Sequence, residues 1–318
     1  MDIDRGYILV TGGAGFIGSW TVEKLISKGY RVVVLDNLLY GSIDNLSKVL
    51  NDIVFINGDI RDSELLDKLF KKYRFYGVIH LAALVSVDEV SQKPSEGYSI
   101  NVYGTFSLLE MSRKYDVERF VYASSAAIYG DPLSLPISED HPLYPKSLYG
   151  ATKLAGEVLV NSYSLNYGLS TISLRYFNVY GPRMKSGPYA GVIYVFIHNV
   201  IHNKPLTIYG DGLQTRDFIY VEDVAEANLL ALESEVIGSY NIGSGSNISI
   251  KDLAYKILRL MGRGDLEIVY DKPRIGDIRH SLADISKATK LLGWKPRISF
   301  EDGLKRTIKY YVKGKEFM

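Results

Sequence analysis

Residues 11–18 read Thr-Gly-Gly-Ala-Gly-Phe-Ile-Gly, and this stretch decides the fold of the chain. It follows a short apolar run, Tyr7–Val10, which predicts a buried strand, and it opens an amphipathic stretch that predicts a helix over about 15–28. Glycine-rich turns are common, so the three glycines alone are weak evidence. A strand before them and a helix after them are typical of a turn that holds the diphosphate of a dinucleotide.

Each glycine of the pattern Gly12-x-x-Gly15-x-x-Gly18 has a physical task. The first permits a tight turn, the second lets backbone approach a diphosphate, and the third lets the helix pack close to the sheet. The helix N-terminus then presents free N–H groups to the phosphates. Asp36 ends the second predicted strand, where a carboxylate can bind both adenosine ribose hydroxyls and repel a 2′-phosphate. The pattern therefore favours NAD over NADP as the cofactor. It also favours a cofactor-binding loop over a purely structural turn that is followed by an aspartate by chance.

The first half of the chain alternates short apolar runs with amphipathic stretches. Strands alternating with helices at this spacing predict right-handed βαβ units and a parallel sheet covered on both faces. Further strands are predicted at 31–35, 53–56, 77–81, 119–123 and 170–174, and helices at 63–72, 96–115 and 147–167.

After Asn178 the pattern changes, because Gly and Pro interrupt it at 181–182 and 187–188. Shorter elements follow, with helices predicted at 192–203, 221–233 and 250–261 and strands at 215–219 and 239–242. We predict an α/β protein with a doubly wound parallel sheet and a smaller mixed α/β domain. The first domain would hold residues 1–177 and about 213–238, and the second about 178–212 and 239–318.

Composition excludes several classes of protein. The 318 residues include 37 Lys plus Arg, 36 Asp plus Glu and no Cys. The net charge of +1 gives no reason to expect a nucleic acid or an anionic membrane as partner. Without Cys there are no disulfides, thiolate zinc sites or cysteine nucleophiles. Neither a signal peptide nor an apolar window of membrane-spanning length is present, so we expect a soluble cytoplasmic protein.

Tyr149 and Lys153 stand four residues apart on a predicted helix and so share one face. A nearby ammonium would lower the pKa of the tyrosine and make it a proton shuttle. The spacing alone is weak, since Tyr311 and Lys315 repeat it in a C-terminal stretch that we expect to be solvated. Context favours Tyr149, because Ser124 and Ser125 end the fifth predicted strand, and ligands of such sheets bind beyond the carboxyl ends of strands.

These motifs resemble those of the extended short-chain dehydrogenases/reductases, specifically the NAD-dependent epimerase/dehydratase family with its Rossmann sheet. Within that family the sequence is most similar to the UDP-glucose 4-epimerases. The resemblance spans the chain through eight ordered motifs: TGGAGFIG at 11–18, GDIRD at 58–62, HLAA at 80–83, SSAAIYG at 124–130, YGATKLAGE at 149–157, RYFNVYGPR at 175–183, YGDGLQTRDFIYVEDVA at 209–225 and GDIRHSLADISKA at 276–288.

The resemblance implies roles for individual residues. Those implied to be catalytic are Ser125, Tyr149 and Lys153. Those implied to bind NAD are Gly12, Gly15, Phe16, Ile17, Gly18, Asp36, Asn37, Asp59, Ile60, Leu81, Ala82, Ala83, Asn101, Tyr149, Lys153 and Tyr176. Those implied to contact the UDP-sugar are Ser125, Tyr149, Asn178, Thr207, Tyr209, Arg216, Arg274 and Asp277. The resemblance also implies a homodimer, formed through the helices at 96–115 and 147–167.

Departures from the family pattern narrow the activity. Dehydratases of the family place Asp-Glu directly after the active-site hydroxyl residue, whereas here Ala126 and Ala127 follow Ser125. The resemblance therefore implies 4-epimerisation of UDP-glucose and UDP-galactose by reversible hydride transfer through a 4-keto intermediate. Ser281 is small where some relatives have a bulky Tyr, which suggests that UDP-N-acetylhexosamines are also accepted.

Other readings stay open from the sequence. They are another sugar-nucleotide epimerase or reductase of the same family, such as a UDP-glucuronate 4-epimerase, and a non-catalytic NAD-binding regulator. Intact catalytic residues disfavour the regulator. His198 and His202 share the spacing of a zinc helix, but no third ligand is apparent, so no metal is expected.

Overall fold

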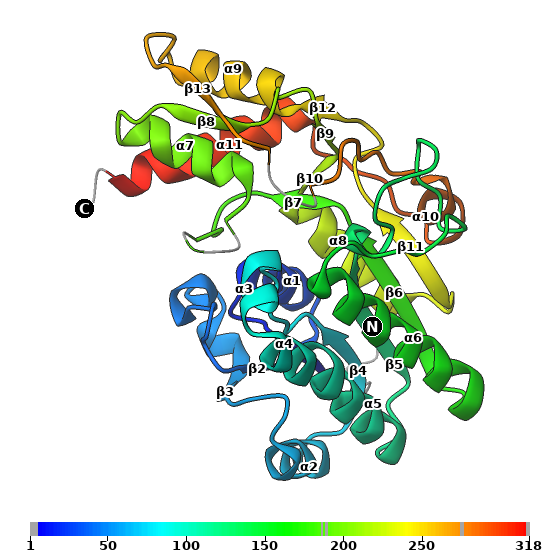
Figure 1. Cartoon of the computed structure of the whole chain (residues 1–318). Helices are drawn as coiled ribbons and strands as arrows, with labels where there is room; N and C mark the ends of the chain where they lie inside the picture. Colours follow the sequence, from blue (N-terminus) through cyan, green and yellow to red (C-terminus); the bar gives the residue numbers. More distant parts are fainter. Residues whose placement is uncertain (1–5, 186, 188–189, 274–276, 316–318) are drawn as a thin grey trace.

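Seven parallel strands form the central sheet of the protein (Figure 1). The computed structural model describes residues 6–185, 187, 190–273 and 277–315. From edge to edge the strands are β11 (Gly238–Ile242), β6 (Ser170–Tyr176), β5 (Arg119–Ser125), β4 (Phe75–His80), β1 (Tyr7–Thr11), β2 (Arg31–Asp36) and β3 (Ile53–Asn57). The strand order reverses direction between β1 and β4, where ligands of such sheets bind. The predicted doubly wound parallel sheet is confirmed.

Helices cover both faces of this sheet. Successive side chains of a strand point to opposite faces. In β1, Ile8 and Val10 are buried under α1 (Phe16–Ser27) and α8 (Val221–Glu233). Leu9 is buried on the other face, in a core shared with three further helices. Those helices are α2 (Ser63–Lys72), α5 (Gly104–Lys114) and α6 (Leu148–Tyr167). Burial on both faces explains the near-continuous apolar strands.

The single helix predicted at 96–115 is interrupted. It consists of α4 (Pro94–Tyr98), a π-helical turn at Ser99–Tyr103 and α5, and the short helix α3 (Val87–Gln92) precedes it. Asn101 lies in the wider turn, and its buried side chain accepts from the Leu84 N–H at 2.7 Å and donates to the Leu84 carbonyl at 2.9 Å. The π-helical turn thus holds the segment that follows β4.

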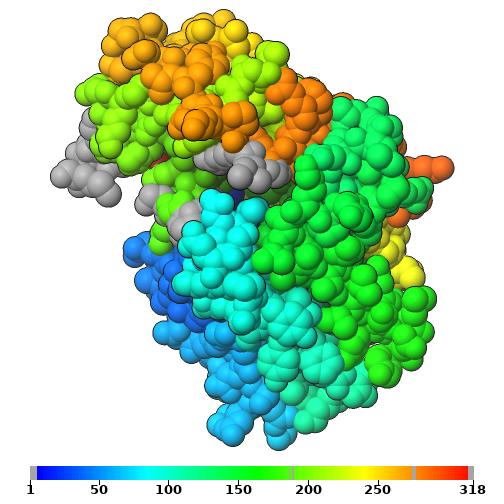
Figure 2. Space-filling view, viewed as in Figure 1, coloured from blue at the N-terminus to red at the C-terminus, as the bar shows by residue number. Residues whose placement is uncertain are grey.

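The second part of the chain forms a smaller lobe, at the top of Figures 1 and 2. Its helices α7, α9 and α11 enclose a separate hydrophobic core around Phe196, Ile208 and Leu253. Its small two-stranded sheets pair β7 with β10, β8 with β13 and β9 with β12. The elements are β7 (Asn178–Tyr180), α7 (Val192–Ile201), β8 (Leu206–Tyr209), β9 (Thr215–Arg216), β10 (Phe218–Tyr220), β12 (Ile248–Ser249), α9 (Ile250–Leu260), β13 (Ile268–Asp271) and α11 (Phe300–Lys315).

Three details differ from the sequence prediction. Strand β11 pairs with β6 in the central sheet, so residues 239–242 belong with that sheet and not with the smaller lobe. The strand predicted at 215–219 divides at Asp217, whose buried carboxylate accepts from the backbone N–H groups of Ser244, Gly245 and Ala283. The stretch around Tyr311 is only partly solvated, because the Tyr311 hydroxyl donates to the Met184 carbonyl at 2.6 Å while Tyr310 and Val312 are exposed.

Helix α10 (Ser286–Leu291), like β11, belongs with the central sheet and not with the smaller lobe. Its Ala288, with Leu292 and Trp294, packs in the core beneath the central sheet, so the chain returns to that sheet after α9. Among the described residues, no helix is long and apolar enough to cross a membrane. Within the same residues, no group of three or more potential ligands is arranged to hold a metal ion.

Candidate active site

The glycine loop lies where backbone segments approach one another closely. Gly12 has φ +68°, and a Cβ there would lie 2.8 Å from the backbone nitrogen of Ala82. A Cβ on Gly18 would lie 2.1 Å from the carbonyl oxygen of Gly12. Gly15 is the N-cap of α1, and no side chain caps that end of the helix. The first turn of α1 therefore keeps its N–H groups available to an anion.

Asp36 is fixed in place at the end of β2. Its Oδ2 accepts from the Ala14 N–H at 2.9 Å and its Oδ1 from the Leu38 N–H at 2.8 Å. Burial raises the pKa of this carboxyl above its ordinary value, and the two backbone hydrogen bonds act against that rise. Two N–H donors occupy only part of the acceptor capacity of a carboxylate. Asp36 can therefore accept hydrogen bonds from ribose hydroxyls without moving.

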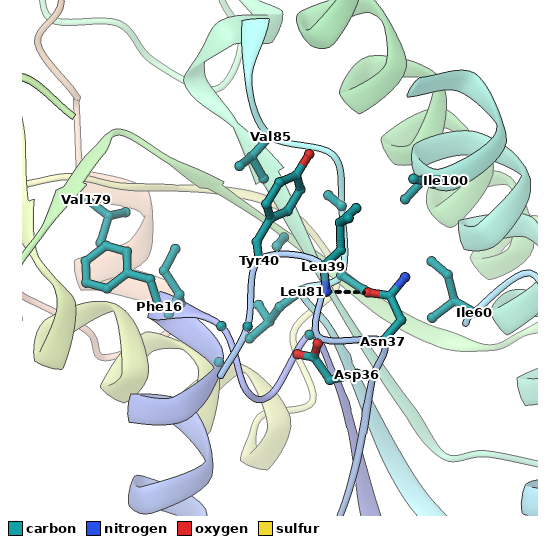
Figure 3. Close-up of a pocket in the computed structure, with 18 of the residues that line it drawn as sticks. Phe16, Asp36, Asn37, Leu39, Tyr40, Ile60, Leu81, Val85, Ile100 and Val179 are labelled. Carbon is teal, nitrogen blue, oxygen red and sulfur yellow. Dashed lines mark hydrogen bonds between the residues drawn. The ribbon is translucent and has the colours of Figure 1, made fainter. Parts of the chain in front are cut away.

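One cavity runs along the carboxyl ends of the strands, and most predicted cofactor residues line it. They are Gly12, Gly15, Phe16, Ile17, Gly18, Asp36, Asn37, Asp59, Ile60, Leu81, Ala82, Ala83, Tyr149, Lys153 and Tyr176. Figure 3 shows Asn37 accepting a hydrogen bond from the Leu39 N–H, with Asp36 below this pair and Tyr40 and Val85 above it. Asn101 does not line the cavity and supports it from behind through the bonds to Leu84 described above.

The three predicted catalytic residues meet in the same cavity. Ser125 ends β5, and its hydroxyl accepts from the Ala127 N–H at 3.2 Å. Tyr149 lies in the first turn of α6, and Lys153 follows one turn later. The sequence predicts a lowered pKa for Tyr149, and this prediction is wrong. Burial raises the pKa of the Tyr149 hydroxyl, and its hydrogen bond with Ser125 only partly opposes the rise. Burial also lowers the pKa of Lys153 to about 7, against the charge of Glu157.

Burial of Lys153 makes stability depend on pH. Its pKa in the folded protein is about 7, against an ordinary 10.5. Between these values the unfolded chain binds more protons, so stability rises with pH across this window. At pH 7 and below, the full cost of burying the charge is present. Lys153→Met removes this cost, so we expect it to raise the free energy of unfolding most at pH 7 or below, and less as the pH rises towards 10.5.

Denaturant unfolding of wild type and Lys153→Met across this pH range measures the effect. Stability curves of wild type and variant that stay parallel would show that burial does not lower the pKa of Lys153.

Two of the predicted substrate residues, Ser125 and Tyr149, line the cavity, and the other described ones do not. In the described part of the chain, Asn178, Thr207, Tyr209, Arg216 and Asp277 are not among its lining residues, and Arg274 lies outside the described residues. The side chain of Asn178 donates to the Asp217 carbonyl at 3.1 Å, and Arg216 forms an ion pair with Asp277. The structure thus gathers most of the predicted cofactor residues and all three predicted catalytic residues into one cavity, and leaves the other described substrate residues of the prediction in the smaller lobe or between the lobes.

Sequence reasoning missed the residues that line the cavity from the segment after β7. Arg183, Met184 and Lys185 belong to this group. The guanidinium of Arg183 lies 4.4 Å from the centre of the Trp20 ring and pairs with Glu23 of α1. Lys185 donates to the Gly41 carbonyl at 3.3 Å. Arg183 ends a motif quoted above, which was the available signal, but only the folded chain brings it back to α1.

Comparisons with known proteins agree with this arrangement. Residues 9–307 match the family model described as GDP-mannose 4,6 dehydratase. A UDP-glucose 4-epimerase of Mycolicibacterium smegmatis is 37% identical over 307 residues, covering 95% of this chain and 97% of that protein. The solved UDP-glucose 4-epimerase of Thermotoga maritima with UDP-glucose is 40% identical, with a TM-score of 0.93, covering 97% of this chain and 99% of that one.

A second solved structure contains the cofactor that the cavity fits. The UDP-glucose 4-epimerase of Thermus thermophilus in complex with NAD is 39% identical, with a TM-score of 0.90, covering 96% of this chain and 99% of that one. In the present chain, the close-packed glycines, the uncapped α1 N-terminus and the fixed Asp36 carboxylate suit a dinucleotide with a free ribose. The protein belongs to the NAD-dependent epimerase/dehydratase family of sugar-nucleotide enzymes.

Proposed function

We propose that the protein is an NAD-dependent 4-epimerase that interconverts UDP-glucose and UDP-galactose. The observation that carries this proposal is the composition of the cavity around Ser125. Ser125, Tyr149 and Lys153 line the cavity together, and Ala126 and Ala127 follow the serine. Such a site can move one proton and support reversible oxidation of one hydroxyl, which is the chemistry that epimerisation needs.

The placement of carboxylates argues against dehydration. Loss of water from a sugar needs an acid and a base beside the reacting carbons. Among the described residues that line the cavity, the carboxylates are Asp36, which ends β2, and Asp59, which follows β3. Ser125 and Tyr149 lie across the sheet, at the end of β5 and the start of α6. No described carboxylate of the cavity lining is therefore available beside the sugar.

The side chains supply the proton transfers. Tyr149 takes the proton of the hydroxyl at sugar C4, and the Ser125 hydroxyl donates a hydrogen bond to the same oxygen. Lys153, when protonated, stabilises the phenolate of Tyr149. NAD supplies a reversible hydride acceptor when bound. Tyr149 returns its proton after the 4-keto sugar has turned its other face to the cofactor site, which gives the epimer.

The smaller lobe is proposed to hold the UDP part of the substrate. Arg216 and Arg274 would bind the diphosphate, because guanidinium groups match phosphate oxygens in geometry and charge. Asp277, now paired with Arg216, would bind the ribose. The remaining contacts of this lobe are proposed to be Asn178 with a phosphate, and Thr207 and Tyr209 with the uracil.

A product assay tests the proposal directly. Purified protein, with no NAD added, is incubated separately with UDP-galactose, UDP-glucuronate and UDP-glucose, and the products are separated by chromatography. Formation of UDP-glucose from UDP-galactose, without net NADH, supports the proposal. Turnover of UDP-glucuronate alone would assign the other epimerase activity. Accumulation of free NADH would indicate a dehydrogenase, and no turnover of any sugar would contradict an enzymatic role.

The small side chain of Ser281 leads us to expect that N-acetylated sugars are also substrates. It is buried beside β9, where its N–H donates to the Thr215 carbonyl at 3.2 Å. We expect wild type to convert UDP-N-acetylglucosamine as well as UDP-glucose. A tyrosine at 281 would fill the space left for the acetyl group, so Ser281→Tyr should lower kcat/KM for UDP-N-acetylglucosamine roughly 100-fold, a typical effect of pocket shape.

Two comparisons control this prediction. Activity of Ser281→Tyr on UDP-glucose should stay close to wild type, and Ser281→Ala should keep both activities because it stays small. Equal activity of wild type and Ser281→Tyr on the acetylated sugar would contradict the role of Ser281.

A homodimer is proposed to form through the helices around 94–114 and 148–167. These helices lie on one face of the molecule (Figure 2) and expose large apolar side chains to solvent. The exposed side chains are Tyr98, Tyr103, Phe106, Val158, Leu165 and Tyr167. Burial of such a surface against a second copy would be favourable. Sedimentation of the purified protein at twice the monomer mass would support this assembly.

A further inference from the structure

A buried carboxylate lies behind the catalytic residues. Glu157 is 1% exposed and stands one helical turn after Lys153 on α6. Its Oε2 accepts from the Ser124 hydroxyl at 2.5 Å and its Oε1 from the Ser239 hydroxyl at 2.7 Å. A buried carboxylate is stable only when partners satisfy its charge and its lone pairs, and here serines from β5 and β11 supply two of them.

Arg175 of β6 completes the set of partners. Its Nη2 donates to Oε1 of Glu157 at 2.6 Å and its Nε donates to the same oxygen at 3.1 Å. The remaining nitrogen, Nη1, donates to the Tyr129 hydroxyl at 2.8 Å and to the Glu139 carbonyl at 2.9 Å. Arg175 is itself 5% exposed, so this ion pair lies in the interior.

The carboxylate of Glu157 therefore ties α6 to three neighbouring strands at the catalytic end of the sheet. Ser124 immediately precedes Ser125, and Arg175 immediately precedes Tyr176, so two of the three ties are adjacent to a residue that lines the cavity. A change in this cluster would move Ser125 relative to Tyr149 and Lys153, which are set by α6.

The cluster also sets the electrostatic surroundings of Lys153. The Lys153 ammonium lies 4.7 Å from the centre of the Tyr122 ring, and neither group is significantly exposed. Burial favours the neutral amine, and Glu157 is the group whose charge favours the ammonium. His80 of β4 is held neutral, since burial lowers its pKa to about 3. The other titratable groups packed around Lys153 and Glu157 are Tyr122, Tyr129, Glu139, Tyr149 and Arg175.

We propose that Glu157 is a positioning residue of the reaction, which fixes the geometry between Ser125 and Tyr149 and favours the protonated form of Lys153 against the effect of burial, while Arg175 limits how much negative charge Lys153 experiences. The inference rests on the proposed function only for the role of Tyr149 as the base. It predicts that the two members of the ion pair act on Tyr149 in opposite directions.

The test compares Glu157→Gln with Arg175→Met. Glu157→Gln removes the carboxylate and leaves the Arg175 cation unpaired, so Lys153 loses its proton more readily and Tyr149 should ionise about one pH unit higher than in wild type. Arg175→Met leaves the carboxylate unneutralised, so Lys153 keeps its proton to higher pH. Tyr149 should then ionise about one pH unit lower. The double variant should return towards wild type.

Ultraviolet difference spectroscopy measures the ionisation of Tyr149. Each holoenzyme is titrated against the same protein carrying Tyr149→Phe, so the other tyrosines cancel. The pH dependence of kcat is expected to shift in the same direction as the titration. Because the titration uses no sugar, a wrong substrate assignment leaves it unchanged, and the two failures can be distinguished.

Ser239→Ala is the matched control, since it removes one hydrogen bond from the same carboxylate without changing charge. Its Tyr149 titration should stay near that of wild type. If Glu157→Gln does not fold, Arg175→Met and the charge-free double variant still carry the comparison. Shifts of both single variants in the same direction, or no shift in Arg175→Met, would leave Glu157 a purely structural residue and overturn the proposal.

Discussion

Replacing Tyr149 with Phe is expected to lower kcat for UDP-galactose by about 1000-fold, in the range that general acid–base catalysis contributes. The phenylalanine ring fills the same volume at the start of α6, so the cavity keeps its shape. Only the hydroxyl that receives the sugar proton, and that bonds to Ser125, is lost. The variant should keep its cofactor, because the glycine loop and Asp36 are untouched.

Two measurements check this expectation. Product formation gives kcat, and the amount of NAD released from the denatured protein gives cofactor content. Tyr311→Phe is the matched control, because Tyr311 and Lys315 have the same spacing in α11. The Tyr311 hydroxyl donates to the Met184 carbonyl at 2.6 Å, so its loss should affect stability more than catalysis. A kcat for Tyr149→Phe within tenfold of wild type would show that another group moves the proton.

Gly18→Ala is expected to remove bound NAD and to destabilise the protein. The added Cβ would lie 2.1 Å from the Gly12 carbonyl oxygen and 2.7 Å from the Gly13 Cα. Both atoms belong to backbone, which cannot rotate away as the end of a side chain could. Either α1 moves off the sheet or the loop changes shape, and overpacking of this kind costs about 1–3 kcal/mol or more. Either change would displace the backbone N–H groups that are expected to bind the phosphates.

Thermal unfolding and NAD content measure both consequences together. Gly264→Ala is the control, since no atom lies within 4 Å of an added Cβ there and its φ is not in the left-handed region. That variant should unfold within about 0.5 kcal/mol of wild type, as surface substitutions usually do. Full NAD content and an unchanged unfolding midpoint in Gly18→Ala would mean that the loop has more space than the structure indicates.

The cofactor half of the site could be predicted because its determinants are local in sequence. The glycine loop is a continuous stretch, and the position of Asp36 at the end of a strand follows from the apolar run before it. Gly18 could be assigned to close packing, and the 2.1 Å that would separate an added Cβ from the Gly12 carbonyl oxygen agrees with that role. Ser125 and Tyr149 come from distant positions, yet each marks the end or the start of a predicted element at the same edge of the sheet.

The remaining features depend on tertiary contacts that no local pattern encodes. Arg183 reaches the cavity only because it packs on Trp20 of α1. The pKa of Tyr149 was expected to fall, but burial raises it, and burial cannot be read from the spacing to Lys153. The sequence also did not predict that β11 joins the central sheet. A short strand after a helix has the same sequence pattern whether it pairs in the central sheet or in a neighbouring one.

The course of the chain between its two cores has a consequence for how such enzymes diversify. The chain leaves the sheet for α7, returns for α8 and β11, leaves again for α9, returns for α10 and leaves finally for α11. The smaller lobe is thus assembled from three separate segments. Grafting it from one relative onto another would require three separate exchanged pieces. New substrate preference is therefore reached more directly by point substitution within the lobe than by recombination of whole domains.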